Sequence, residues 1–123
     1  MGSSSAAQIK YRNTPKGYLG SLYGGIKRRS ESKNIPCFTK EELLEFGLGS
    51  EKFHTLFKLF IATGRQRKYA PSVDRICPRL GYVKDNVQWL TVGENSRKYQ
   101  AYLRKKERSG VREWLRNVVR KFL

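Results

Sequence analysis

Asp74 and Asn95 are the two side chains whose types and spacing could do chemistry. They flank a stretch typical of a strand, a long loop, a second strand and the start of a helix. A hairpin folded against a helix can bring both side chains to one point. A carboxylate oxygen and an amide carbonyl are hard ligands suited to Mg²⁺, which keeps several waters and binds substrate phosphate directly. Asp74 and Asn95 are therefore candidate metal ligands.

The spacing of apolar residues predicts the strands and the helix that must position Asp74 and Asn95. Alternation of apolar and polar residues predicts strands at 72–76 and 86–91, with a loop at 77–85 between them. Residues 92–107 are predicted to form a helix that a break at Ser109 and Gly110 ends. Residues 111–123 form an amphipathic helix in this interpretation, and we expect segment 108–123 to pack on the same domain because a small chain needs that apolar face for its core. The alternatives for this face are a membrane surface or a partner groove.

The first half of the chain is expected to be a helical leader, residues 15–68, after a disordered basic arm at 1–14. Apolar residues recur at helical spacing from Tyr18 to Ile26, although glycines weaken that helix. Thr39 and Glu42 form a capping-box pattern that opens a short helix. Ser50 is predicted to cap the next helix, which carries His54 and closes at Gly64. A lone histidine there is expected to be structural or exposed.

The charge of the chain is strongly one-sided. Lys and Arg number 26 against 10 Asp and Glu, a net charge of +16. Nucleic acid is the commonest partner of such a chain, because each neutralised phosphate releases condensed counterions. An anionic membrane, packing on RNA and a solvated basic surface are the alternatives. The candidate nucleic-acid contacts are Lys27, Arg28, Arg29, Arg65, Arg67, Lys68, Arg79, Lys84, Arg97 and Lys98.

The sequence also indicates the cellular compartment and excludes one class of metal site. No apolar run approaches the ~20 residues that span a bilayer, and the N-terminus does not resemble a secretory signal. We therefore expect a cytoplasmic protein without a membrane partner. Cys37 and Cys77 are isolated from each other, and a structural zinc site is not expected.

Residues 71–98, PSVDRICPRLGYVKDNVQWLTVGENSRK, resemble the HNH endonuclease superfamily, whose core is a ββα-metal fold. The resemblance is to variants from phages and mobile elements that read S-L-D-R-I-D, then G-Y, then D/E-N-V/C-R-W, then N-x-x-K. The matching segments, in order and with similar gaps, are Ser72–Ile76, Gly81–Tyr82, Asp85–Trp89 and Asn95–Lys98. They cover less than a quarter of the chain.

The resemblance implies a role for several residues. Asp74 would be the first metal ligand and Asn95 the terminal one, around a single Mg²⁺ or Mn²⁺ ion. Asn86 would brace the loop by hydrogen bonds, and Trp89 would lie in the core. Arg75 stands where better-studied members have a histidine general base, and it stays protonated, so its implied catalytic role is to clamp phosphate or stabilise transition-state charge.

Cys77 stands where the phage variants place an Asp, which removes a carboxylate from the site. As a whole, the resemblance implies an α+β fold, mostly helical, with an HNH-like hairpin-helix core at 69–107. The implied function is a divalent-metal-dependent DNA endonuclease or nickase in the cytosol of a phage-infected or host cell. A DNA-binding protein of the same descent with weak or no cleavage is the first alternative, and an RNA-binding basic protein is the second. Duplex DNA is the expected partner.

Overall fold

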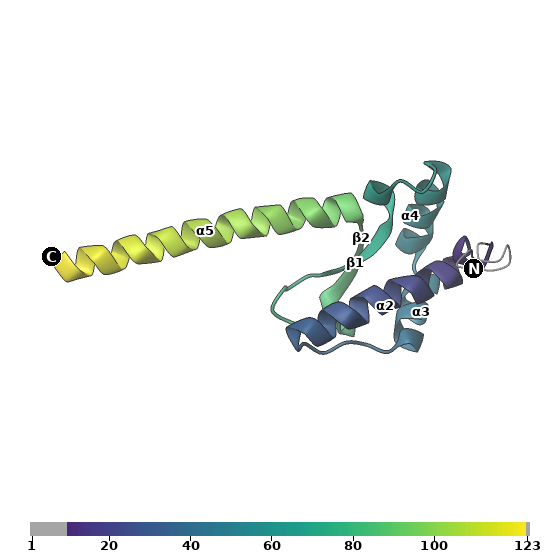
Figure 1. Ribbon diagram of the computed structural model, residues 1–123, viewed down its shortest axis with the longest axis horizontal. Coiled ribbons are helices and arrows are strands. Elements are labelled where there is room, and N and C mark those ends of the chain that lie inside the picture. Colours follow the sequence, from purple (N-terminus) through teal and green to yellow (C-terminus); the bar gives the residue numbers. More distant parts are fainter. Residues whose placement is uncertain (1–9, 123) are drawn as a thin grey trace, which may run out of the picture.

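The structure, a computed structural model, describes residues 10–122, and it describes side chains as far as Glu107. The chain is a mostly helical α+β protein, as predicted, with one antiparallel hairpin. Figure 1 shows α2, α3 and α4 gathered around the hairpin, with α5 leading away from them. The elements in order are α2 (Pro15–Lys33), α3 (Lys40–Leu48), α4 (Glu51–Ala62), η1 (Arg67–Tyr69), β1 (Pro71–Arg75), η2 (Lys84–Asn86), β2 (Val87–Thr91) and α5 (Val92–Phe122).

Helix α2 is longer than the predicted helical stretch because both of its ends are capped. The Thr14 side chain accepts a hydrogen bond from the backbone N–H of Gly17, and Asn34 ends the helix in the left-handed conformation with a φ of 53°. The prediction that the N-terminal arm is disordered is wrong for residues 10–14. Residues 10–12 form a helical turn, and Thr14 donates to the Tyr11 carbonyl. The rest of the arm lies outside the described residues.

The two helices that follow begin where their caps were predicted. Thr39 and Glu42 form the full capping box of α3, and the Ser50 side chain caps α4 through the Phe53 N–H. His54 is half-buried, and its Nε2 lies 2.9 Å from the Leu48 carbonyl oxygen. This histidine of α4 therefore contacts the last residue of α3 and helps to hold the two helices together.

The hairpin confirms both predicted strands to within one residue. Its register pairs Val73 with Trp89 and Asp74 with Gln88. Because paired residues share a face of an antiparallel sheet and faces alternate along each strand, Val73 and Trp89 lie on one face and Asp74 and Gln88 on the other. The first of these faces is buried against the helical layer.

The hydrophobic core joins the leader helices to the hairpin. Trp89 is buried as predicted; its ring stacks on Phe46 with centroids 5.2 Å apart and lies 4.8 Å from Phe53. Tyr18 of α2 donates a hydrogen bond of 2.5 Å to the Pro71 carbonyl at the start of β1, and its burial raises the pKa of the phenol to about 12. Segments 15–68 and 69–107 therefore share one core.

Helix α5 covers the other side of the hairpin and begins directly after β2. Thr91 and Glu94 cap it reciprocally, with bonds of 3.0 and 3.1 Å. The predicted break at Ser109 and Gly110 is wrong, because α5 continues to Phe122. A single internal glycine costs a helix only about 1 kcal/mol, which the helix can tolerate. The predicted packing of segment 108–123 concerns side chains outside the described ones.

Candidate functional site

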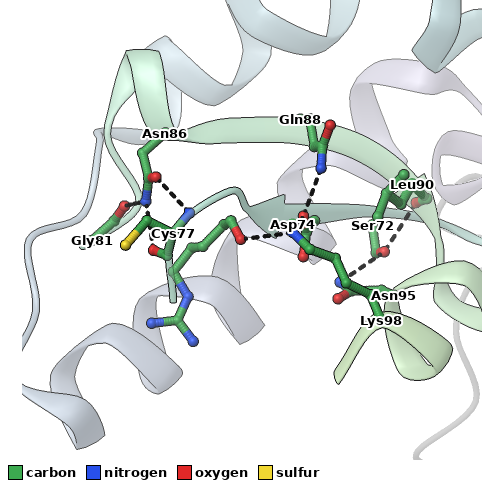
Figure 2. Close-up of polar contacts among 10 residues, drawn as sticks. Ser72, Asp74, Cys77, Gly81, Asn86, Gln88, Leu90, Asn95 and Lys98 are labelled. Atoms are coloured by element: carbon green, nitrogen blue, oxygen red, sulfur yellow. Dashed lines mark hydrogen bonds and ion pairs between the residues drawn. The ribbon is translucent and has the colours of Figure 1, made fainter. Parts of the chain in front are cut away.

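The hairpin face that carries Asp74 lies under the first turns of α5 (Figure 2). Ser72 and Asp74 on β1 share this face with Gln88 and Leu90 on β2, because they are register partners. Asn95 and Lys98 reach it from α5. They are three residues apart, the spacing that places two side chains on one side of a helix. The site is therefore built from two strands and one helix.

Asp74 is a buried carboxylate with only 6% of its surface exposed. Its Oδ2 accepts a hydrogen bond of 2.8 Å from Gln88 Nε2 and one of 2.5 Å from Lys98 Nζ (Figure 2). The Lys98 ammonium also donates to the Arg75 carbonyl at 3.2 Å. The ion pair compensates the burial of the Asp74 charge, which would be costly without a partner, and it ties α5 to the end of β1.

Asn95 joins the same face one turn earlier along α5. Its Nδ2 donates to Ser72 Oγ at 3.3 Å, and Ser72 Oγ donates to the Leu90 carbonyl at 3.0 Å. The structure thus brings together the two candidate metal ligands, on neighbouring positions of one surface. Because the Asn95 amide directs its nitrogen at Ser72, its Oδ1 is the atom that a cation would use.

The chemistry of this donor set fits a cation that needs few protein ligands. Within residues 10–107, no three His, Cys, Asp or Glu side chains gather as a metal cluster. Mg²⁺ is commonly bound through one or two carboxylates together with waters and substrate phosphates, and Asp74 with Asn95 would supply one carboxylate and one amide oxygen. A divalent ion at Asp74 Oδ2 would compete with the Lys98 ammonium for that oxygen.

Arg75 is not brought to this face. Its guanidinium donates from Nη1 to the Pro78 carbonyl at 2.9 Å and lies 5.2 Å from the centre of the Tyr82 ring. Arg75 pairs with buried Val87 in the hairpin register, on the side opposite Asp74. Its side chain therefore supports the loop between the strands, while its backbone carbonyl faces Lys98.

Asn86 is placed as a brace of that loop. Its Oδ1 accepts from the Cys77 N–H at 2.9 Å, and its Nδ2 donates to the carbonyls of Cys77 and Gly81 at 3.1 and 2.9 Å (Figure 2). Asn86 is buried, so these bonds satisfy its amide where water does not reach it. The loop is held in one shape immediately beyond Asp74 and Arg75.

Nearly all the candidate nucleic-acid-binding residues are exposed to solvent, where phosphates could reach them. Every one except Lys98 is exposed. Arg65 lies over the Phe60 ring at 4.9 Å and donates to Asn13 Oδ1. The backbone of Gly93 passes close to the Lys68 carbonyl, so the strip at 65–68 adjoins the beginning of α5.

Gln88 and the position of Lys98 are what reasoning from the sequence missed. The sequence motif assigns no role to Gln88, and it indicates only a nucleic-acid contact for Lys98. Two signals were available. Gln88 lies on the second strand with the parity that faces Asp74, and Lys98 follows Asn95 by three residues. A buried aspartate needs a hydrogen-bonded or charged partner, and these two residues provide it.

Comparison of the chain with family models, with curated proteins and with solved structures finds no match. Within the part of the chain that the structure describes, no helix has both the length and the apolar character needed to cross a membrane.

Proposed function

We propose that this chain binds duplex DNA and hydrolyses phosphodiester bonds as an HNH-like endonuclease or nickase of the ββα-metal type, with a single Mg²⁺ or Mn²⁺ ion. The observation that carries the proposal is the placement of a buried carboxylate, Asp74, on the face of the hairpin to which Asn95 of α5 is bonded through Ser72. The resemblance of residues 71–98 to the HNH motif also supports it.

Each residue of the site has a defined task in this proposal. Asp74 and Asn95 would hold the ion, which when bound would polarise the scissile phosphate and stabilise the leaving oxygen. Lys98 neutralises Asp74 in the free protein. With an ion held by Asp74, the Lys98 ammonium would be free to contact a phosphate oxygen. The protein provides no histidine at the position after Asp74, so the attacking water depends on another base.

Binding is supported by charge independently of cleavage. A chain with a net charge of +16 gains affinity by displacing counterions from DNA. The exposed cations Lys27, Arg28, Arg29, Arg65, Arg67, Lys68, Arg79, Lys84 and Arg97 would supply contacts to the DNA backbone. Such contacts position a protein on the duplex without reading its sequence.

A second candidate is a DNA-binding protein of the same scaffold that does not cleave. One observation favours it: the Lys98 ammonium already occupies the oxygen of Asp74 that an ion would use. In that case the pair is a structural bridge between β1 and α5. Binding would then be independent of divalent metal.

A plasmid assay separates these candidates. The wild type, Asp74→Asn and Asn95→Ala are incubated with supercoiled plasmid and Mg²⁺ or Mn²⁺, with Asp85→Asn, an exposed acid on η2, as the matched control. We expect nicked or linear plasmid from the wild type and Asp85→Asn, and a loss of at least about 100-fold in Asp74→Asn.

Equal inertness of the wild type and Asp74→Asn with every metal would refute cleavage. If both then bound duplex DNA equally, with a steep salt dependence, the second candidate would stand. Binding assays with duplex DNA, single strands and structured RNA at one salt concentration test the partner. A clear preference for structured RNA would refute both DNA proposals and support the RNA-binding alternative.

A further inference from the structure

The loop between β1 and β2 exposes aliphatic side chains that a folded protein usually buries. Ile76, Leu80 and Val83 have 52%, 55% and 39% of their surface exposed. All three lie within eight consecutive positions, and exposed cations, Arg79 and Lys84, lie among or next to them. Apolar groups gathered at one loop and bordered by charge indicate a contact surface.

The loop backbone is held firmly while these side chains point into water. Asn86 makes three hydrogen bonds to Cys77 and Gly81. Tyr82 exchanges backbone bonds of 2.9 Å with the segment after α2, accepting from the Phe38 N–H and donating to the Pro36 carbonyl. A preformed loop loses little conformational freedom when it binds, which favours affinity.

The charge of the surrounding surface favours a polyanionic occupant. Asp85 is the single acidic residue between Ile76 and Asn86, and the chain as a whole carries a charge of +16. The loop also begins two residues after Asp74, so Ile76 lies within about 7 Å of that residue along the strand. A duplex seated on the loop would therefore bring its backbone close to the Asp74 face.

We propose that this loop, Ile76–Val83, inserts Ile76 and Leu80 into the minor groove of duplex DNA while Arg79 and Lys84 contact the phosphates on its two sides. Proteins that bind the minor groove commonly place aliphatic side chains against base steps in this way. The inference rests on the proposed DNA binding and adds the groove and the residues that enter it.

Binding isotherms at several salt concentrations test the proposal, with a fluorescent duplex as the probe. The loop variant is Ile76→Ser with Leu80→Ser, and the matched control is Leu59→Ser, an aliphatic residue of α4 that is 43% exposed. We expect the loop variant to bind about tenfold more weakly with an unchanged salt slope, and the control to bind like the wild type. Arg79→Ala should reduce the salt slope by about 1.

Two further measurements make the test decisive. Netropsin, which fills the minor groove, should compete with the wild type for an A·T-rich duplex, and circular dichroism should show the same helical content in all variants. If the wild type binds DNA but neither netropsin nor the loop variant changes its affinity, the loop proposal is overturned while DNA binding stands. If the loop variant instead abolishes self-association in sedimentation and leaves DNA affinity unchanged, the loop is a protein contact and the proposal is wrong.

Discussion

Lys98 Nζ lies 2.5 Å from Oδ2 of Asp74, and this pair joins the second turn of α5 to the end of β1. The two residues differ in environment, because the Asp74 side chain is 7% exposed and that of Lys98 is 39% exposed. Loss of the ion pair would therefore cost more for the buried aspartate charge than for the half-exposed lysine charge. The same contact locks α5 onto the hairpin and balances the charge at the candidate site.

Replacing Lys98 by Met should lower the free energy of unfolding by about 1–2 kcal/mol, because Asp74 keeps its Gln88 bond but loses its cation. Urea unfolding followed by circular dichroism measures the change. Lys105→Met, at an exposed position of the same helix, is the control and should stay within about 0.5 kcal/mol of the wild type. Equal midpoints for the two variants would show that the ion pair is not stabilising.

Asn86→Ala should destabilise the protein by about 2–4 kcal/mol, because it removes three hydrogen bonds and leaves the backbone N–H of Cys77 without a partner. Hydrogen exchange should show the Cys77 amide losing protection first. Asn86→Asp keeps the acceptor for that amide and should protect it more than Asn86→Ala does. Unchanged exchange at Cys77 in both variants would contradict the bracing role.

Two glycines should respond to alanine in opposite directions. A Cβ on Gly81 would lie 2.4 Å from the Pro36 carbonyl oxygen, so Gly81→Ala should cost about 1–3 kcal/mol by pushing the loop from the segment after α2. A Cβ on Gly24, within α2, meets nothing within 4 Å. Gly24→Ala should therefore stabilise the helix by about 0.5–1 kcal/mol. Thermal unfolding of both variants checks the prediction, which a loss of stability in Gly24→Ala would refute.

Glu94 should make stability depend on acid. The bond from the Thr91 N–H to its carboxylate holds the pKa of Glu94 below its ordinary value of 4.5. A depressed pKa in the folded state gives stability that is present above pH 4.5 and is lost as the pH falls through the folded-state pKa. The melting temperature of the wild type should therefore fall more steeply than that of Glu94→Gln over this acid range.

Glu107→Gln, at an exposed position of the same helix, is the control for that titration. Its melting temperature should follow the wild-type profile across the same range. If Glu94→Gln and the wild type lose stability in parallel, the cap does not contribute to the acid dependence.

Much of the fold could be predicted because it depends on residues close together in the chain. The capping box of Thr39 and Glu42 spans three positions, and the alternation that marks β2 needs only five residues. The same alternation places Trp89 on one side of the strand with Val87, and the resemblance implies that Trp89 lies in the core. The continuity of α5 could not be predicted locally, since Ser109 and Gly110 are weak helix formers that a long helix can still include.

The site shows where local information ends. The sequence by itself determined that Asp74 lies on a strand, that Asn95 lies near the start of a helix and that Asn86 lies at the far end of the loop. Only the tertiary structure decided that Lys98 meets Asp74 from 24 positions away and that the Arg75 side chain lies on the opposite face. The reason is physical: a buried charge takes its partner from whichever element the packing brings near, and spacing along the chain does not specify that element.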